Sequence, residues 1–298
     1  MKVLYLNNCW FTNVGEAFID IGAMKLIKNV FNNPQIINFS SMNNWYISDI
    51  LKDEKYQYLD MSRYYSGEYV VLAGMFGSED FLNNSVSLKK IKGLVEKGAK
   101  LIFLGFGQCT YKESETKKII EFFKEIKPVL MVSRDNVVYN NFKDIVPSIN
   151  GLDCAFWVSE VYDPRTTPDE EYDVVTFNRS PYPEIVNPTR QILTAYHFQY
   201  YLTRNKIKDN MLISDTPYDY ITLYANAKKV WTDLLHASII SLQYERPVKF
   251  QRVDKRGYAI DTLNDIAEFD EEGYMHIKSD LLADKKKAIE IEIRNIIN

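Results

Sequence analysis

The unit that decides the fold reads Trp231-Thr232-Asp233-Leu234-Leu235-His236-Ala237-Ser238-Ile239-Ile240. An apolar strand runs into Thr232 or Asp233, either of which is a good helix N-cap, and apolar residues then recur at helical spacing. The pattern predicts a helix over 234–245 with His236 in its first turn, at the C-terminal end of a strand. Open α/β sheets bind ligands at such strand ends, where the free N–H groups of the helix attract anions. His236, one of three histidines in the chain, is therefore the first candidate for a functional residue.

Short apolar runs alternate with amphipathic segments along most of the chain. In the first half the pattern predicts strands at 2–7, 35–39, 69–73, 100–104 and 129–133, with helices at 16–31, 79–98 and 114–127. After a polar segment with two prolines at 159–171, it predicts strands at 172–178, 210–214, 228–231 and 247–251 and helices at 188–204, 217–226 and 234–245. Strands joined by helices of this length form parallel sheets. We therefore expect an α/β protein of two Rossmann-like domains, 1–158 and 172–270, with a C-terminal helix at 279–298 that packs back at the domain junction.

The composition is that of a globular protein without a nucleic-acid partner. The 298 residues carry 36 basic and 40 acidic side chains, a formal net charge of -4, with no long block of either sign. This balance excludes the basic surface that nucleic-acid binding requires, and no window approaches the roughly 18 apolar residues of a membrane span. Cys9, Cys109 and Cys154 lack metal-ligand spacing, so the sequence predicts no metal site. An odd number of thiols without a secretory leader favours the cytoplasm.

Three glycine-containing loops follow predicted strands of the first domain. Glycine lets the backbone approach a ligand closely, and loops after the strands of one parallel sheet share one edge. The first loop lacks the GxGxxG pattern of dinucleotide sites, and an ordinary loop capped by its asparagine is an equally weighted interpretation. Together the loops predict a binding edge. Their candidate residues are Asn13, Gly15 and Glu16, then Gly74 and Gly77, then Gly105 and Gly107.

Charged residues follow other strands. Arg134 ends the fifth predicted strand and would bind a carboxylate or phosphate bidentately, although a structural pair with Asp135 or another carboxylate is an equal alternative. Asp153 fits either a helix cap or a cleft carboxylate. Arg179 follows the first strand of the second domain and is a second candidate anion clamp.

Each histidine allows a packing role beside a chemical one. A lone histidine next to an apolar helix face is more often a hydrogen-bonded packing residue, but His236 lies beside Asp233 at a helix start and could serve as acid or base. His197 is expected in mid-helix with a structural role. His276 is expected in a terminal strand without a partner.

Taken in order, these pieces resemble the polysaccharide pyruvyl transferase family. The elements that match are Asn13-Val14-Gly15-Glu16, Ala73-Gly74-Met75-Phe76-Gly77, Leu104-Gly105-Phe106-Gly107, Val132-Ser133-Arg134-Asp135, Leu152-Asp153-Cys154-Ala155-Phe156 and Thr232-Asp233-Leu234-Leu235-His236-Ala237. The last corresponds to the family hallmark S-D-R-L-H-A, with Leu234 in place of the arginine.

The resemblance implies a GT-B-like architecture and transfer of a pyruvyl group from phosphoenolpyruvate to sugar hydroxyls, without a cofactor or metal. It implies His236 as the acid/base, Arg134 as a donor clamp, and Asp153 or Glu16 as groups that orient sugar hydroxyls. Loss of the family arginine at Leu234 removes a cation from an anion site, and Arg134 and Arg179 could supply that charge. The remaining implied substrate-binding residues are Asn13, Gly15, Gly74, Gly77, Gly105, Gly107, Thr232, Asp233 and Leu235.

Two other functions are open on the sequence alone. A GT-B-type glycosyltransferase using a nucleotide sugar would place a diphosphate near Arg179 and the helix start at 232–236. A family member without catalysis, binding a glycan or a partner enzyme, is favoured by Leu234. The resemblance implies a saccharide acceptor, lipid-linked or nucleotide-activated, met in the cytoplasm at the inner face of the membrane. It does not indicate the acceptor sugar, the linkage or the oligomeric state.

Overall fold

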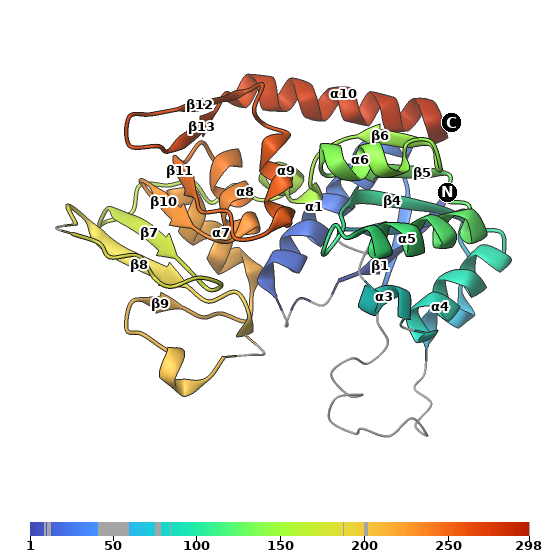
Figure 1. The fold of residues 1–298 in the computed structure, drawn as a ribbon, viewed down its shortest axis with the longest axis horizontal. Helices are drawn as coiled ribbons and strands as arrows, with labels where there is room; N and C mark the ends of the chain where they lie inside the picture. Colours follow the sequence, from blue (N-terminus) through green and yellow to red (C-terminus); the bar gives the residue numbers. More distant parts are fainter. Residues whose placement is uncertain are drawn as a thin grey trace.

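The computed structural model describes residues 1–8, 10, 13–40, 60–74, 79–83, 85–186, 188–199 and 202–297. These residues form two β-sheets surrounded by helices, with one long C-terminal helix lying along both halves (Figure 1). The predicted fold class, α/β with parallel sheets and a C-terminal helix, is confirmed.

The first sheet is parallel throughout, in the order β2-β1-β3-β4-β5-β6. β3 is buried along its whole length, as expected for a parallel strand covered on both faces. Helix α1 packs on one face of the sheet, and α4, α5 and α6 pack on the other. The strands are β1 (Lys2–Asn7), β2 (Gln35–Ser40), β3 (Tyr69–Ala73), β4 (Lys100–Phe106), β5 (Leu130–Ser133) and β6 (Ser148–Asn150). The helices are α1 (Val14–Val30), α3 (Glu79–Asn83), α4 (Ser85–Glu96), α5 (Glu113–Ile126) and α6 (Asn136–Phe142).

The second sheet has the order β12-β13-β11-β10-β7-β8-β9. Strands β7 to β11 pair in parallel, and β12 and β13 add an antiparallel edge beyond residue 266. The strands are β7 (Tyr172–Thr176), β8 (Gln191–Ala195), β9 (Met211–Leu212), β10 (Val230–Thr232), β11 (Val248–Phe250), β12 (Ala267–Phe269) and β13 (Met275–Ile277). The helices are α7 (Pro217–Asn226), α8 (Leu235–Gln243) and α9 (Tyr258–Asp261).

Two predicted helices are wrong in the structure. Within 188–204 the chain forms strand β8 and a short 3-10 helix, η4 (Arg204–Lys206). A strand that is partly covered on both faces carries apolar residues on both sides, and this arrangement imitates helical spacing. The predicted helix over 79–98 is instead two helices, α3 and α4, and residue 84 between them lies outside the described residues.

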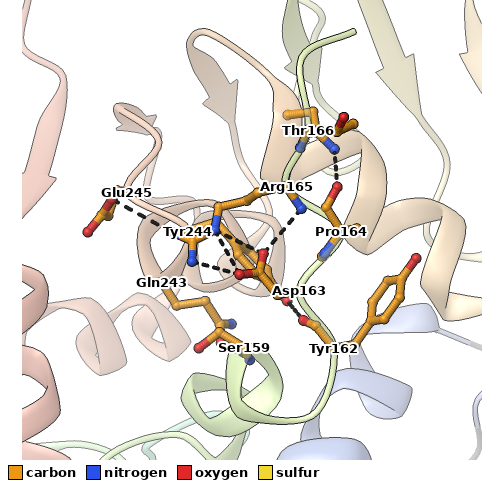
Figure 2. A network of polar contacts seen from close by, with 10 residues as sticks. Ser159, Tyr162, Asp163, Pro164, Arg165, Thr166, Gln243, Tyr244 and Glu245 are labelled. Carbon is orange, nitrogen blue, oxygen red and sulfur yellow. Dashed lines mark hydrogen bonds and ion pairs between the residues drawn. The ribbon is translucent and has the colours of Figure 1, made fainter.

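The polar segment that joins the two sheets is held against the C-terminal end of α8 (Figure 2). It follows a 3-10 helix, η2 (Cys154–Glu160), in which the backbone N–H of Ser159 donates to Gln243 at 2.7 Å. Further along, Arg165 forms a two-pronged pair with Asp163, at 2.7 Å for the closest contact. The Ser159 contact and a hydrogen bond from the Tyr244 hydroxyl to the carbonyl of Tyr162 join this segment to the C-terminal end of helix α8, whose N-terminal end carries His236.

The C-terminal helix α10 (Ser279–Ile297) contacts both halves of the molecule, as its course along the top of Figure 1 suggests. Lys285 donates to the carbonyl of Thr262 in the second half at 2.6 Å. Glu290 accepts from Trp157 at 2.8 Å and from Asn29 of α1 at 2.7 Å. Among the described helices, none is both long and apolar enough to cross a membrane.

Candidate active site

A cavity opens between the two halves, at the carboxyl ends of β5, β7, β8, β10 and β11. It holds about 590 Å³ of space free of atoms, a volume that includes open solvent. The first half contributes the start of α1 and the residue after β5, and the second half contributes the remaining walls. Its lining residues are Asn13, Glu16, Ile19, Arg134, Arg179, His197, Phe198, Asp233, Leu234, Leu235, His236, Phe250, Val253, Asp254, Arg256 and Gly257.

His236 lies in the first turn of α8, as predicted, and lines the cavity. Its side chain is 13% exposed, while its Nε2 is buried and makes no hydrogen bond to any residue that the structure describes. The ring packs on the backbone of Gly15 in α1, where an added Cβ would come within 2.3 Å of Nδ1. Nearby, the backbone N–H of Val14 donates to the carbonyl of His197 at 3.0 Å. The two halves therefore meet at the imidazole, and only glycine at position 15 leaves room for it.

Arg134 extends into the same cavity but is only 2% exposed. Its NH1 lies 3.3 Å from Oδ2 of Asp153, while Nε and NH2 make no hydrogen bond to any residue that the structure describes. Burial opposes the charge, but Tyr111 and the surrounding carboxylates outweigh it and raise the pKa of Arg134. A buried guanidinium with one free edge is costly unless an acceptor meets that edge. This free edge is the strongest sign of a ligand in the structure.

Asp153 lies behind the cavity wall and joins the two cationic groups. It is fully buried, its Oδ2 lies 3.3 Å from Arg134 NH1 and 3.6 Å from His236 Nε2, and its Oδ1 accepts from Ala155 N–H at 3.0 Å. Burial alone would raise the pKa of Asp153, but His236 and Arg134 outweigh it and lower the pKa to about 2. The helix-cap interpretation is confirmed, because the carboxylate caps η2, whereas Asp153 is not among the residues that line the cavity.

The predicted N-cap of α8 is wrong. The cap position is Leu234, which makes no side-chain cap bond, and the hydroxyl of Thr232 accepts from Leu234 N–H at 3.0 Å. Asp233 faces the loop after β7 instead, where it accepts from the backbone N–H groups of Asn178 and Arg179 at 3.0 and 2.8 Å. The carboxylate of Asp233 thus anchors the loop that carries Arg179.

A second group of charges lies on the cavity wall of the second half, and we call Arg179, Asp254 and Arg256 the arginine cluster. Oδ2 of Asp254 accepts from Arg179 NH1 at 2.9 Å and from Arg256 Nε at 2.9 Å. The Arg179 guanidinium also lies 5.3 Å from the ring centre of Phe198. Burial raises the pKa of Asp254, and the charges of Arg179 and Arg134 act against it.

Glu16 lies at the start of α1 and lines the cavity beside these groups. Burial raises the pKa of Glu16, and the charges of His236 and Arg134 oppose the rise. Asn13 caps α1 as predicted, since its side chain accepts from Gly15 N–H at 3.0 Å. The loop therefore serves both interpretations, as a helix cap and as part of the cavity.

Four predicted glycines do not line the cavity, and a fifth, Gly77, lies outside the described residues. Gly15 and Gly107 make room for side chains that do: a Cβ on Gly107 would lie 2.3 Å from Nε of Arg134. Gly74 and Gly105 lie elsewhere along the first sheet's edge, and Thr232 is turned inward, donating to Thr176 at 2.8 Å. The binding of a ligand by these glycine loops stays a prediction.

Two histidine predictions change. His197 follows β8 rather than lying in a helix; it is buried, and its Nε2 pairs with Tyr224 at 2.7 Å. Burial, followed by the charges of His236 and Arg179, lowers the pKa of His197 to about 3, so this ring is neutral. His276 has a partner after all, since its Nε2 lies 3.2 Å from Asp270.

Sequence reasoning missed the part of the wall formed by Phe250 to Gly257. These residues follow β11, so the rule about strand ends could have identified the segment, although nothing distinguished Asp254 and Arg256 from other surface charges. Within the described residues, no group of three or more His, Cys, Asp or Glu side chains could hold a metal ion.

The fold and the site define a class: an α/β protein with two largely parallel sheets and a charged cleft between them. The chain belongs to the polysaccharide pyruvyl transferase family, whose sequence model matches residues 13–248. The recognition made from the sequence motifs is confirmed. No curated protein sequence matches the chain.

Solved structures support the architecture. A functionally uncharacterised protein from Klebsiella pneumoniae matches with 14% identity and a TM-score of 0.51, covering 88% of this chain and 87% of that one. The S. aureus MnaA protein, solved with UDP, matches with 10% identity and a TM-score of 0.51, covering 99% and 90%. A UDP-GlcNAc 2-epimerase from Methanocaldococcus jannaschii matches with 13% identity and a TM-score of 0.50, covering 88% and 87%. At such identities the likeness concerns the fold alone.

Proposed function

We propose that this protein transfers the pyruvyl group of phosphoenolpyruvate to hydroxyls of a saccharide. The observation that carries the proposal is the free edge of Arg134, a buried cation that faces the same cavity as His236. Phosphoenolpyruvate offers the planar carboxylate that such an edge binds bidentately. Membership of the family gives the reaction class.

The chemistry balances without a redox partner. The enol CH2 of the donor takes a proton and becomes CH3, and an acceptor hydroxyl adds its oxygen to the neighbouring carbon. The bond from that carbon to the phosphate oxygen then breaks, with the electron pair leaving on the phosphate. A second hydroxyl of the saccharide closes the ketal. Of the two hydroxyl protons, one balances the new methyl group and the other leaves with phosphate.

The residues of the cleft have distinct roles in this scheme. His236 exchanges the proton with the donor or the acceptor, since it is the partly exposed imidazole on the cavity wall, and Arg134 holds the carboxylate. Glu16, beside them at the start of α1, accepts hydrogen bonds from saccharide hydroxyls. Asp153 touches no substrate and is a positioning residue, because it orients His236 and Arg134 from behind.

The acceptor in this proposal is a lipid-linked or nucleotide-activated saccharide, met in the cytoplasm at the inner face of the membrane. Cell-surface or exopolysaccharide synthesis is the process that uses such intermediates.

The test combines donor and acceptors. The protein is incubated with phosphoenolpyruvate and a panel of nucleotide-linked and lipid-linked saccharides, and phosphate release and the mass of the acceptor are measured. We expect phosphate release and the change in acceptor mass to occur together, and we expect neither with the His236→Gln variant. His276→Gln is the matched control, because His276 does not line the cavity. Full activity in His236→Gln, or binding of UDP-sugars with no binding of phosphoenolpyruvate, would refute the proposal.

A further inference from the structure

An exposed tryptophan follows β1, at the same edge of the first sheet at which the cavity opens. Trp10 is 38% exposed, yet its indole N–H donates to the carboxylate of Asp20, which is fully buried in α1. Apart from that nitrogen the indole ring consists of carbon atoms, so the ring surface left to solvent is apolar. Trp10 thus presents an apolar surface outward while its polar atom is held inside the protein.

The carboxylate of Asp20 is the anchor of the chain that follows β1. Its Oδ1 accepts from the hydroxyl of Tyr5 at 2.5 Å and from Nδ2 of Asn8 at 2.7 Å. Its Oδ2 accepts from the backbone N–H of Asn8 at 2.9 Å and from Trp10. Nδ2 of Asn8 also donates to the carbonyl of Ala73, at the end of β3, at 3.1 Å. A ring that is held in this way loses little freedom when a ligand binds to it, and such preorganisation favours binding.

The anchor lies next to the wall of the cavity. Glu16 and Ile19 line the cavity, and Asp20 follows them on α1. Residues four apart on a helix lie on one face, with their Cβ atoms about 5–6 Å apart, so Glu16 and Asp20 are neighbours. A Cβ on Gly74 would lie 3.0 Å from Cδ1 of Ile19 and 3.8 Å from Nδ2 of Asn8, so both of these side chains reach the end of β3. The indole is therefore held beside the cavity, although it is not among the lining residues.

The composition of this segment differs from that of the cleft. From Asn7 to Asn13 the sequence has three asparagines, a threonine and no charged residue, whereas three arginines line the cavity. A neutral segment with an aromatic ring and amide side chains suits a neutral, hydroxyl-rich ligand better than an anion. A sugar ring has both complements, because its C–H groups form an apolar face that stacks on an indole and its hydroxyls bond amides at its edge.

We infer that the saccharide acceptor stacks on the ring of Trp10 and extends from there into the cavity. This inference rests on the proposed function and deepens it, because it gives the neutral acceptor a place apart from the arginines that bind the anionic donor. Glu16, which accepts hydrogen bonds from saccharide hydroxyls in the proposed function, lies about one helical turn from the anchor. Trp10 touches the ligand, whereas Asp20 is a positioning residue that acts through Trp10.

Binding of uncharged sugars tests the inference. The probes are methyl glycosides of common hexoses, with and without an N-acetyl group, and uridine, and their binding to the whole chain is measured by saturation-transfer difference NMR. We expect Trp10→Ala to weaken binding of the best glycoside about tenfold, the order expected for the loss of one stacked ring, and Trp10→Phe to restore part of the affinity. Saturation transfer should be strongest at the C–H protons of one face of the sugar. Binding of phosphoenolpyruvate, measured by calorimetry, should be the same in the parent and in both variants.

Tyr64→Ala is the matched control. Tyr64 is 71% exposed and ends the 3-10 helix η1 (Met61–Tyr64), which precedes β3 and so lies towards the opposite edge of the first sheet. Its loss should change no affinity. Asp20→Asn is a second variant that keeps the indole but replaces one of its two carboxylate oxygens by a nitrogen that cannot accept. It should weaken glycoside binding and leave phosphoenolpyruvate binding unchanged. Melting temperatures of all variants verify folding.

The outcomes distinguish this inference from the proposed function. Absence of glycoside binding to the parent, or glycoside binding that is indifferent to Trp10, overturns the inference even if pyruvyl transfer is observed. Trp10-dependent binding of uridine without binding of any glycoside also overturns it, because the ring would then stack on a base. Trp10-dependent glycoside binding without binding of phosphoenolpyruvate supports the saccharide site and removes the proposed donor. A loss of glycoside affinity at unchanged phosphoenolpyruvate affinity in Trp10→Ala supports the inference whether or not transfer to that glycoside is observed.

Discussion

Replacing Asp153 with asparagine should destabilise the protein strongly, because the carboxylate is the counter-ion of a buried arginine. The lowering of its pKa from 3.8 to about 2 corresponds to about 2.5 kcal/mol of stability at neutral pH. Removing one partner of a buried pair typically costs about 3–5 kcal/mol, since the other charge is left without compensation. We therefore expect a loss of about 2.5–5 kcal/mol, or a fall of about 1 M or more in the urea midpoint.

A matched variant breaks a shorter ion pair at the surface. The Asp163–Arg165 contact is 2.7 Å, against 3.3 Å for Asp153–Arg134, but its side chains are 45% and 43% exposed (Figure 2). Exposed pairs contribute at most about 1 kcal/mol, because water and salt screen them. Asp163→Asn should therefore change the urea midpoint far less than Asp153→Asn, and a comparable effect of the two would refute the reasoning.

The pH dependence supplies a second check on Asp153. A carboxyl whose folded pKa is depressed stabilises the protein above its unfolded pKa, and this contribution disappears as the pH falls through the folded pKa. The difference in urea midpoint between the parent and Asp153→Asn should thus be constant from pH 7 to about pH 5 and should shrink between about pH 4 and 2. A difference that grows on acidification would contradict the assignment.

Three further predictions concern the cleft and its supports. Gly107→Ala should displace the Arg134 guanidinium and weaken phosphoenolpyruvate binding about tenfold or more in calorimetry, whereas Gly93→Ala, whose Cβ would meet nothing within 4 Å, should not. Burial raises the pKa of Asp20 to about 7. Between about pH 4 and 7 the folded protein therefore holds a proton that the unfolded chain has lost, and its stability falls as the pH rises through this range. Asp20→Asn should remove that part of the pH dependence of the urea midpoint. Leu234→Arg should tighten phosphate binding about tenfold, measured by 31P line broadening. It should also lower the melting temperature, because Leu234 is only 4% exposed and packs in the core. Unchanged phosphate affinity would show that position 234 faces away from the phosphate.

The sequence predicted the architecture well where strands are fully buried. Strands β1, β3, β4 and β5 lie close to their predicted ranges. Their apolar runs are too short for a helix and are typical of a buried strand. Around β8 the pattern failed, since Ile192 and Leu193 are both partly buried on opposite faces and imitate helical spacing. Packing against other elements decided the secondary structure there, and the spacing of apolar residues in the sequence does not reveal that packing.

The candidate site was predictable as a location and less so as a set of contacts. Strand-end reasoning brought His236, Arg134, Glu16 and Arg179 to one cavity. It assigned to ligand binding two glycines whose role is to admit His236 and Arg134. It also missed Arg256. This arginine lies in a loop and is held at the cavity by hydrogen bonds to Asp254, and these hydrogen bonds are visible only in three dimensions.

Each cationic region of the cleft is held in place by its own acidic residue. The two regions belong to different halves of the molecule, so the site needs both halves. Asp153 holds Arg134, while Asp254 holds Arg179 and Arg256, so neither group depends on a ligand for its position. The imidazole of His236 is different, because it contacts Asp153 and the Gly15 backbone, both in the first half, while its own helix belongs to the second. Any movement of one half against the other therefore changes the surroundings of His236 before it changes either cationic region.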